Sequence, residues 1–226
     1  MWNDFGAKKL RLIRRKTEKK KNNGKNKNYE RRGVLYIMDW NGNEKIREEG
    51  DRTEIGNANP DFFGGLGKTL YWKVLMVNAT FTYSVGADRF YDEEKSSAGD
   101  INSYNVSKNV LKSWTMNPGV DRGYPRAMYY GWGSNSIITD RYVHDASFLR
   151  LSALNISYRL PKRLFGSSIV DAIDLTFQAT NLFTWTKYPG MDPQGNFSTS
   201  YSAFYNMGID YSSYPSARTY NVGIKI

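Results

Sequence analysis

One segment of the chain alternates apolar and polar residues with a period of two. In residues 171–185, apolar side chains occupy nearly every odd position from Ile173 to Trp185, and the even positions are mostly Asp, Thr and Gln. From 174 to 184, Leu182 is the one apolar residue at an even position. The run is longer than the ~5–6 residues of an ordinary globular strand. A single apolar face over ~9–11 residues is typical of a strand with lipid on one side and water on the other.

The same alternation predicts further strands elsewhere in the chain. It is clearest in residues 74–86 and in the second half of 148–159. Strands are also predicted at 33–40 and 216–226, and a weak, Gly-rich one at 62–71. Because period-two patterns put one face of each strand in an apolar medium, these segments favour an all-β fold.

Short and long connections alternate between the expected strands. The turn after residue 71 and the segment 160–170 are short, whereas 87–145 and 186–215 are long and rich in Gly, Ser and aromatic residues. Loops this long are unusual in a compact soluble domain but ordinary on the outer side of an outer-membrane barrel. We therefore predict antiparallel, up-and-down strands, about five or six in number, with both long loops at the same, extracellular end.

Four stretches of the chain resemble the C-terminal end of the SusC/RagA family of TonB-linked outer-membrane transporters. They occur in the family's order and cover roughly residues 34–226. In chain order they are Asp51–Gly65, Ser147–Pro161, Asn181–Pro193 and Ala217–Ile226.

The resemblance implies a fold, a function, partners and a location. The fold is the C-terminal part of a large outer-membrane β-barrel, and the function is TonB-dependent uptake of oligosaccharides or peptides, with no enzymatic activity and no cofactor. The implied partners are outer-membrane lipid, a SusD-like surface lipoprotein, the glycan or peptide substrate, and TonB acting through an N-terminal plug. The implied location is the outer membrane of a Gram-negative, Bacteroidetes-type bacterium.

The family carries its plug and most of its barrel before these motifs, and the chain shows no signal peptide. We therefore expect the chain to be a C-terminal piece of a longer protein, inactive by itself. Barrels of this kind usually end in an aromatic residue, so we also expect the natural chain to continue past Ile226.

The net charge of +10 comes from the first part of the chain. Residues 1–32 hold 13 Lys and Arg against 3 acidic residues, whereas residues 33–226 are neutral overall. We predict two regions: 1–32, a basic low-complexity arm that is disordered or partly helical, and 33–226, the barrel segment. The neutral body gives no reason to expect nucleic-acid binding. The alternative function is a soluble β-sandwich that binds carbohydrate and carries a basic arm.

Candidate chemistry is sparse. One histidine and no cysteine leave little material for a metal site or a catalytic triad, and we assign no catalytic residue. Asp39, Asn41 and Asn43 have the spacing of a calcium loop, but Glu44 replaces its glycine, so a turn held by Asx hydrogen bonds is favoured.

Acidic clusters and aromatic residues fill the long loops. The clusters around Glu48–Glu54 and Asp92–Glu94 are interpreted as solvated loop charge. Rigid aromatic side chains with polar tips suit stacking on sugars or packing against a partner protein, or packing of the loops on one another. The candidates for substrate or partner contact are Tyr91, Trp114, Tyr130, Trp132, Trp185, Tyr188 and Tyr205.

Overall fold

The computed structural model describes residues 9–13, 52–98, 105–113, 124, 126–127, 139–164, 172–195, 208–211 and 213–226. They belong to two compact units. The loop unit draws on Met1–Ala58, Asp88–His144 and Asn196–Ser212. The sheet unit draws on Asn59–Ala87, Asp145–Gly195 and Ser213–Ile226.

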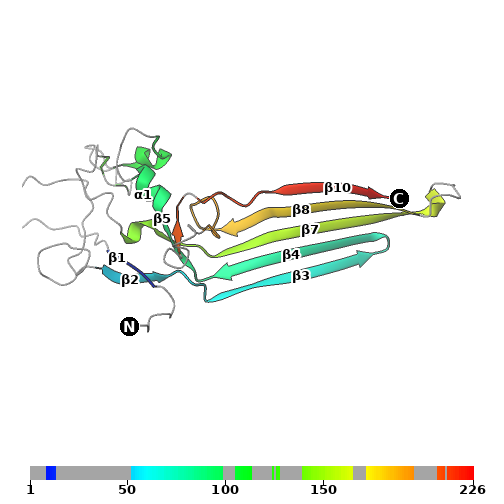
Figure 1. Ribbon diagram of the computed structural model, residues 1–226, viewed down its shortest axis with the longest axis horizontal. Coiled ribbons are helices and arrows are strands. Elements are labelled where there is room, and N and C mark those ends of the chain that lie inside the picture. Colours follow the sequence, from blue (N-terminus) through cyan, green and yellow to red (C-terminus); the bar gives the residue numbers. More distant parts are fainter. Residues whose placement is uncertain are drawn as a thin grey trace, which may run out of the picture. The chain divides into compact units, whose positions relative to one another are not determined.

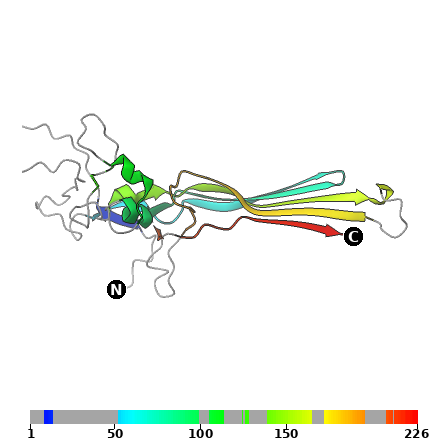
Figure 2. The ribbon, with the colours of Figure 1, turned by 90° about the horizontal axis from the view of Figure 1, so that it is seen from above.

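The sheet unit is built on one five-stranded antiparallel sheet (Figure 1). Its order is β10-β8-β7-β4-β3, so strands that follow one another within this unit lie side by side. Seen from above, the five strands form a single layer (Figure 2). This arrangement confirms the predicted all-β, antiparallel, up-and-down fold. The strands are β3 (Phe62–Trp72), β4 (Leu75–Val85), β7 (Phe148–Pro161), β8 (Ala172–Thr186) and β10 (Thr219–Lys225).

Strand register gives the sheet two different faces. Directly paired residues project to the same side, so apolar residues line up in rows that cross all five strands. One such row is Leu70, Val77, Ile156, Phe177 and Val222. The neighbouring row on the opposite face is Thr69, Asn78, Asn155, Gln178 and Asn221.

The apolar face is not covered by the rest of the sheet unit. Leu66 is 65% exposed and Val222 is 80% exposed, and many other large apolar side chains of these strands are also exposed. A contiguous exposed patch of this extent marks a surface that meets lipid or another protein.

Two bulges interrupt the alternation. Ser152 is an extra residue of β7 relative to β4, and Asn181 and Leu182 of β8 together lie opposite the single Ser152. Leu182 therefore breaks the odd–even pattern because it belongs to a bulge. Asn181 adopts a left-handed backbone with φ of 51°, and its Nδ2 donates a hydrogen bond to the carbonyl of Ala217 at 3.0 Å.

The loop unit contains short elements around a small core. β1 (Lys9–Ile13) pairs antiparallel with β2 (Arg52–Asn57). Phe90 and Tyr142 form the buried centre, packed by Ile55, Val143 and Ile209. The other elements are β5 (Asp88–Tyr91), α1 (Asp92–Ala98), β6 (Val143–Asp145), β9 (Ile209–Asp210) and the 3-10 helices Lys108–Lys112 and Asp140–Tyr142.

Two local expectations need correction. The long connection 87–145 contains short strands and helices, which are too brief to leave a periodic signal in the sequence. Lys9–Ile13 form a strand, although the composition around them favours a helix, because pairing with β2 outweighs local propensity. The rest of residues 1–32 lies outside the described residues, so the division at residue 32 stays a prediction. None of the helices in the described residues is long and apolar enough to cross a membrane.

The bulge at Asn181 is a testable feature of the sheet. Asn181→Gly and Asn181→Val both remove the hydrogen bond to Ala217, but only valine is strained at positive φ. We expect Asn181→Val to be less stable than Asn181→Gly by about 1–3 kcal/mol, measured by denaturant unfolding of the detergent-solubilised protein. Equal stability of the two variants would contradict the left-handed bulge.

Candidate functional site at the loop end of the sheet

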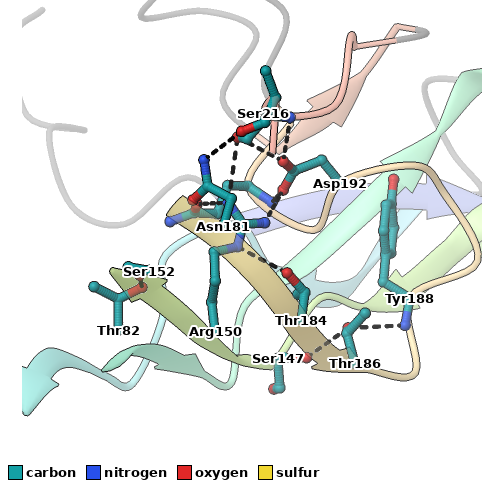
Figure 3. Close-up of polar contacts among 12 residues, drawn as sticks. Thr82, Ser147, Arg150, Ser152, Asn181, Thr184, Thr186, Tyr188, Asp192 and Ser216 are labelled. Atoms are coloured by element: carbon teal, nitrogen blue, oxygen red, sulfur yellow. Dashed lines mark hydrogen bonds and ion pairs between the residues drawn. The ribbon is translucent and has the colours of Figure 1, made fainter. Parts of the chain in front are cut away.

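A buried arginine lies on the polar face of the sheet, close to the end from which the long connections leave. Arg150 of β7 is only 4% exposed. Its Nε donates to Thr184 Oγ1 at 3.0 Å, and its Nη2 donates to Asp192 Oδ1 at 2.6 Å (Figure 3). Its Nη1 donates to Gln194 Oε1 at 2.7 Å and to Ser216 Oγ at 3.3 Å. Every nitrogen of the guanidinium thus has a partner, as a buried cation requires.

Asp192 is the counter-charge and is equally buried, at 4% exposure. Its Oδ1 also accepts from the Gln194 backbone N–H at 2.9 Å, and its Oδ2 accepts from both N–H and Oγ–H of Ser216. Burial alone would raise the pKa of Asp192, but the hydrogen bonds from Gln194, Arg150 and Ser216 outweigh it and hold this pKa below its usual value. Asp192 is therefore ionised at neutral pH and forms a charged pair with Arg150.

The Arg150 cluster joins three stretches of chain that are distant in sequence. Arg150 comes from a sheet strand, Asp192 and Gln194 follow β8, and Ser216 precedes β10. Nearby, Thr186 Oγ1 donates to the Ser147 carbonyl at 2.8 Å and accepts from the Tyr188 N–H (Figure 3). The cluster fixes both ends of the connection between β8 and β10 on the sheet. Removing Arg150 or Asp192 leaves the other charge buried without its counter-charge.

A second buried carboxylate organises the loop unit. Glu94 of α1 accepts from the Tyr124 hydroxyl at 2.7 Å, and its other oxygen lies 2.7 Å from His144 Nε2. Burial alone would raise the pKa of Glu94, but hydrogen bonds from His144 and Tyr124 outweigh it and lower this pKa. Burial and the neighbouring Glu94 raise the pKa of Tyr124, and the Arg141 guanidinium lies 4.1 Å from the Tyr124 ring centre.

The Glu94 cluster corrects one sequence interpretation. Asp92 and Glu94 are buried, at 5% and 9% exposure, and are not solvated loop charge as expected. Asp92 accepts from Ser96 Oγ and pairs with Lys95 Nζ at 2.7 Å, both within its own helix. Glu94 is the carboxylate that joins α1 to Tyr124 and His144. In the described part of the chain, no group of three or more His, Cys, Asp or Glu residues could hold a metal ion.

The aromatic candidates are dispersed in the structure. Tyr91 lies in the loop unit with its ring edge-on to His144, the centres 6.5 Å apart. Trp185 is 54% exposed on the apolar face of the sheet, beside Phe183, and Tyr188 is 5% exposed. Their contact with substrate or partner stays a prediction. The remaining candidates lie outside the described residues, as does the calcium candidate: Trp114, Tyr130, Trp132 and Tyr205, and Asp39, Asn41 and Asn43.

Comparison with known proteins identifies the family. No family model matches the chain. The chain is 33% identical over 197 residues to TonB-dependent receptor P3 of Formosa agariphila, matching 86% of this chain and 19% of that protein. It is 25% identical over 195 residues to TonB-dependent receptor SusC of Bacteroides thetaiotaomicron, matching 84% of this chain and 17% of that protein. The chain belongs to the SusC/RagA family of TonB-dependent receptors.

Solved structures agree with this SusC/RagA assignment in fold. A structure of the RagAB peptide importer in its open-open state covers 99% of the chain with a TM-score of 0.65 and 21% identity. A second, in the closed-closed state, covers 85% with a TM-score of 0.60 and 24% identity. The five strands therefore have the fold of a β-barrel wall. The chain spans about a fifth of the length of these relatives.

Sequence reasoning did not single out the Arg150 cluster. The one feature of the local sequence that could have indicated the cluster is Arg150 itself. It is a charged residue in the first half of β7, where the alternation is irregular, two residues before the bulge at Ser152. The partners Asp192 and Ser216 follow 42 and 66 residues later, so no local pattern links them.

The Arg150–Asp192 pair predicts a large effect on stability. Arg150→Met leaves the Asp192 carboxylate buried without its counter-charge, and such losses cost about 3–5 kcal/mol. We expect a lower unfolding midpoint and faster tryptic cleavage at Lys187 and Arg218, which flank the tethered segments. The matched control is Arg159→Met, since Arg159 also pairs with a carboxylate, Asp174, at 2.8 Å but is 65% exposed. Similar losses in the two variants would contradict the special role of the buried pair.

Proposed function

We propose that this chain forms part of the barrel wall of an outer-membrane, TonB-dependent importer. The observation that carries the proposal is the two-faced register of the sheet. Apolar rows cross all five strands on one side, and polar rows cross them on the other. In a membrane barrel the first face meets lipid and the second faces the lumen.

Aromatic residues at both ends of the apolar face support a membrane-spanning position. Tyr83 and Trp185 belong to a row near the long connections. Trp72 and Tyr158 belong to a row near the turn between β3 and β4. Aromatic belts of this kind lie at the two membrane–water interfaces of outer-membrane barrels. The turn end then faces the periplasm, and the long connections face the outside.

The complete importer carries the remaining proposed functions. We propose that it takes up oligosaccharides or peptides in a Gram-negative bacterium of the Bacteroidetes type, with a SusD-like lipoprotein at the outer surface. TonB would supply energy through a plug domain. The relatives are named as receptors and an importer, which fits a protein without enzymatic activity. The alternative β-sandwich requires a second sheet against the apolar face, whereas the described strands of the sheet unit form one layer.

The position of the apolar face can be tested with two neighbouring residues of β10. The chain has no cysteine, so Val222→Cys and Asn221→Cys each add one labelling site to this segment of the full receptor. Cysteines elsewhere in that receptor are first replaced by serine, and the labelled receptor is placed in lipid vesicles. We expect the label at 222 to collide preferentially with oxygen, which dissolves in lipid, and the label at 221 to lack this preference. Collision of both labels mainly with a water-soluble nickel complex would contradict a lipid-facing wall.

The importer function can be tested in cells. Deleting the receptor gene should abolish uptake of at least one class of labelled oligosaccharide or peptide, and a protonophore should abolish the same uptake in the parent strain, because TonB-linked import needs an energised inner membrane. Re-expression of the receptor is the control. Unchanged uptake of both substrate classes in the deletion strain would contradict the proposed import.

A further inference from the structure

Charge is distributed unevenly between the two ends of the sheet unit. Among its described residues, basic and acidic side chains balance at the end of the long connections and do not balance at the opposite end, where the turns after β3 and β7 lie (Figure 1). At the first end, the charged residues are Arg150, Lys187 and Arg218, and Asp61, Asp145 and Asp192. At the turn end, they are Lys73, Arg159, Lys162, Arg163 and Lys225, and Asp174. The excess of positive charge at the turn end predicts an anionic partner there.

Part of the charge at the turn end belongs to the polar face. Arg159, Asp174 and Lys225 form one row on that face, and Arg159 Nε lies 2.8 Å from Asp174 Oδ1. This row therefore lies on the lumen side of the proposed wall. The other three basic side chains are exposed and lie in the turns at the rim of the sheet. They are Lys73, between β3 and β4, and Lys162 and Arg163, in the 3-10 helix Lys162–Leu164 that follows β7.

Lys73 connects this rim to the aromatic row of the apolar face. Its ammonium group lies 5.9 Å from the ring centre of Trp72, which is 64% exposed. The cation is thus held on the side of the turn that the proposed function turns to lipid. Lys73 also has a left-handed backbone, with φ of 53°. Glycine or asparagine adopts this conformation with less strain, and strain that is retained at an exposed residue points to a use for its side chain.

The three rim residues lie at the depth of lipid headgroups. Lys73 directly follows Trp72, and Tyr158 is in the same row as Trp72, at the periplasmic interface of the proposed wall. Lys162 comes four residues after Tyr158, so at a rise of ~3.4 Å per residue and a tilt of ~40° it lies about 10 Å further out at most. The headgroup layer is ~5–8 Å thick, and long basic side chains extend into it.

We propose that Lys73, Lys162 and Arg163 form a surface that binds the headgroup phosphates of anionic phospholipids in the periplasmic leaflet of the outer membrane. Ammonium and guanidinium groups donate charge-assisted hydrogen bonds to phosphate oxygens. The occupant is a lipid because the exposed aromatic side chains of Trp72 and Tyr158 lie directly beside these charges, where they contact the upper part of the acyl chains. The inference rests on the proposed position of this face in the outer membrane.

Quenching of a fluorescent label by nitroxide-labelled lipids tests this surface. Leu160→Cys carries the label on the apolar face, two residues before Lys162, in the full receptor with its other cysteines replaced by serine. The receptor is placed in phosphatidylcholine vesicles that contain a small share of nitroxide-labelled phosphatidylglycerol or nitroxide-labelled phosphatidylcholine. We expect phosphatidylglycerol to quench about two- to fivefold more strongly, and high salt to reduce this preference. The matched label at Leu149→Cys, in the row of Trp185 at the charge-balanced end, should show no preference.

Charge variants identify the residues responsible for the preference. Lys73→Asn removes one charge but suits the left-handed turn. We expect it to reduce the preference for phosphatidylglycerol without lowering the heat-unfolding midpoint in neutral detergent. Combining it with Lys162→Gln and Arg163→Gln should abolish the preference. The control is Lys225→Gln, which removes the same charge at the same end but on the polar face, and should keep the preference.

The outcomes separate this proposal from the proposed function. Equal quenching at residue 160 by the two lipids, the same preference at residue 149, or a preference that survives the triple variant overturns the phosphate-binding surface. Loss of the preference in Lys225→Gln overturns it as well. If lipids still quench both labels in those cases, the lipid-facing wall stands without this surface. If neither label is quenched by either lipid, the membrane position itself is wrong.

Discussion

Strand register is the constraint on which the rest of the sheet unit depends. Side chains of a strand alternate between faces, so a slip of one residue between β7 and β8 would turn a whole row of leucine, isoleucine and phenylalanine toward the polar side. The two bulges do not weaken this constraint. Both bulges, at Ser152 of β7 and at Asn181 and Leu182 of β8, lie side by side in the sheet. Beyond them the apolar rows continue on the same face.

Two basic residues of the sheet, one on each face, have different surroundings. Arg150 is on the polar face, where Asp192 and the side chains of Thr184, Gln194 and Ser216 satisfy its guanidinium even though it is buried. Lys68 is on the apolar face with alanine and leucine around it. The charge of Arg150 is paired within the described residues, and the pair ties both ends of the connection between β8 and β10 to the sheet.

In the loop unit, too, a buried charged group is hydrogen-bonded to partners. Its apolar core is little more than Phe90 and Tyr142 with three partly buried neighbours. Such a core buries little apolar surface, and the hydrogen bonds of Glu94 with Tyr124 and His144 add polar links between distant segments of the unit. Long outer connections of a barrel can in this way present a defined surface while they remain rich in polar residues.

The sequence by itself determined the strands of the sheet, their two faces and their up-and-down order, because a period of two in residues such as Ile173–Trp185 is a local property. It also carried the resemblance to the SusC/RagA family. Only the tertiary structure decided that Leu182 belongs to a bulge, that Lys9–Ile13 form a strand, and that Arg150 meets Asp192. Each of these depends on partners tens of residues away, and the burial that makes a charge or a strand pair stable exists only after those segments have come together.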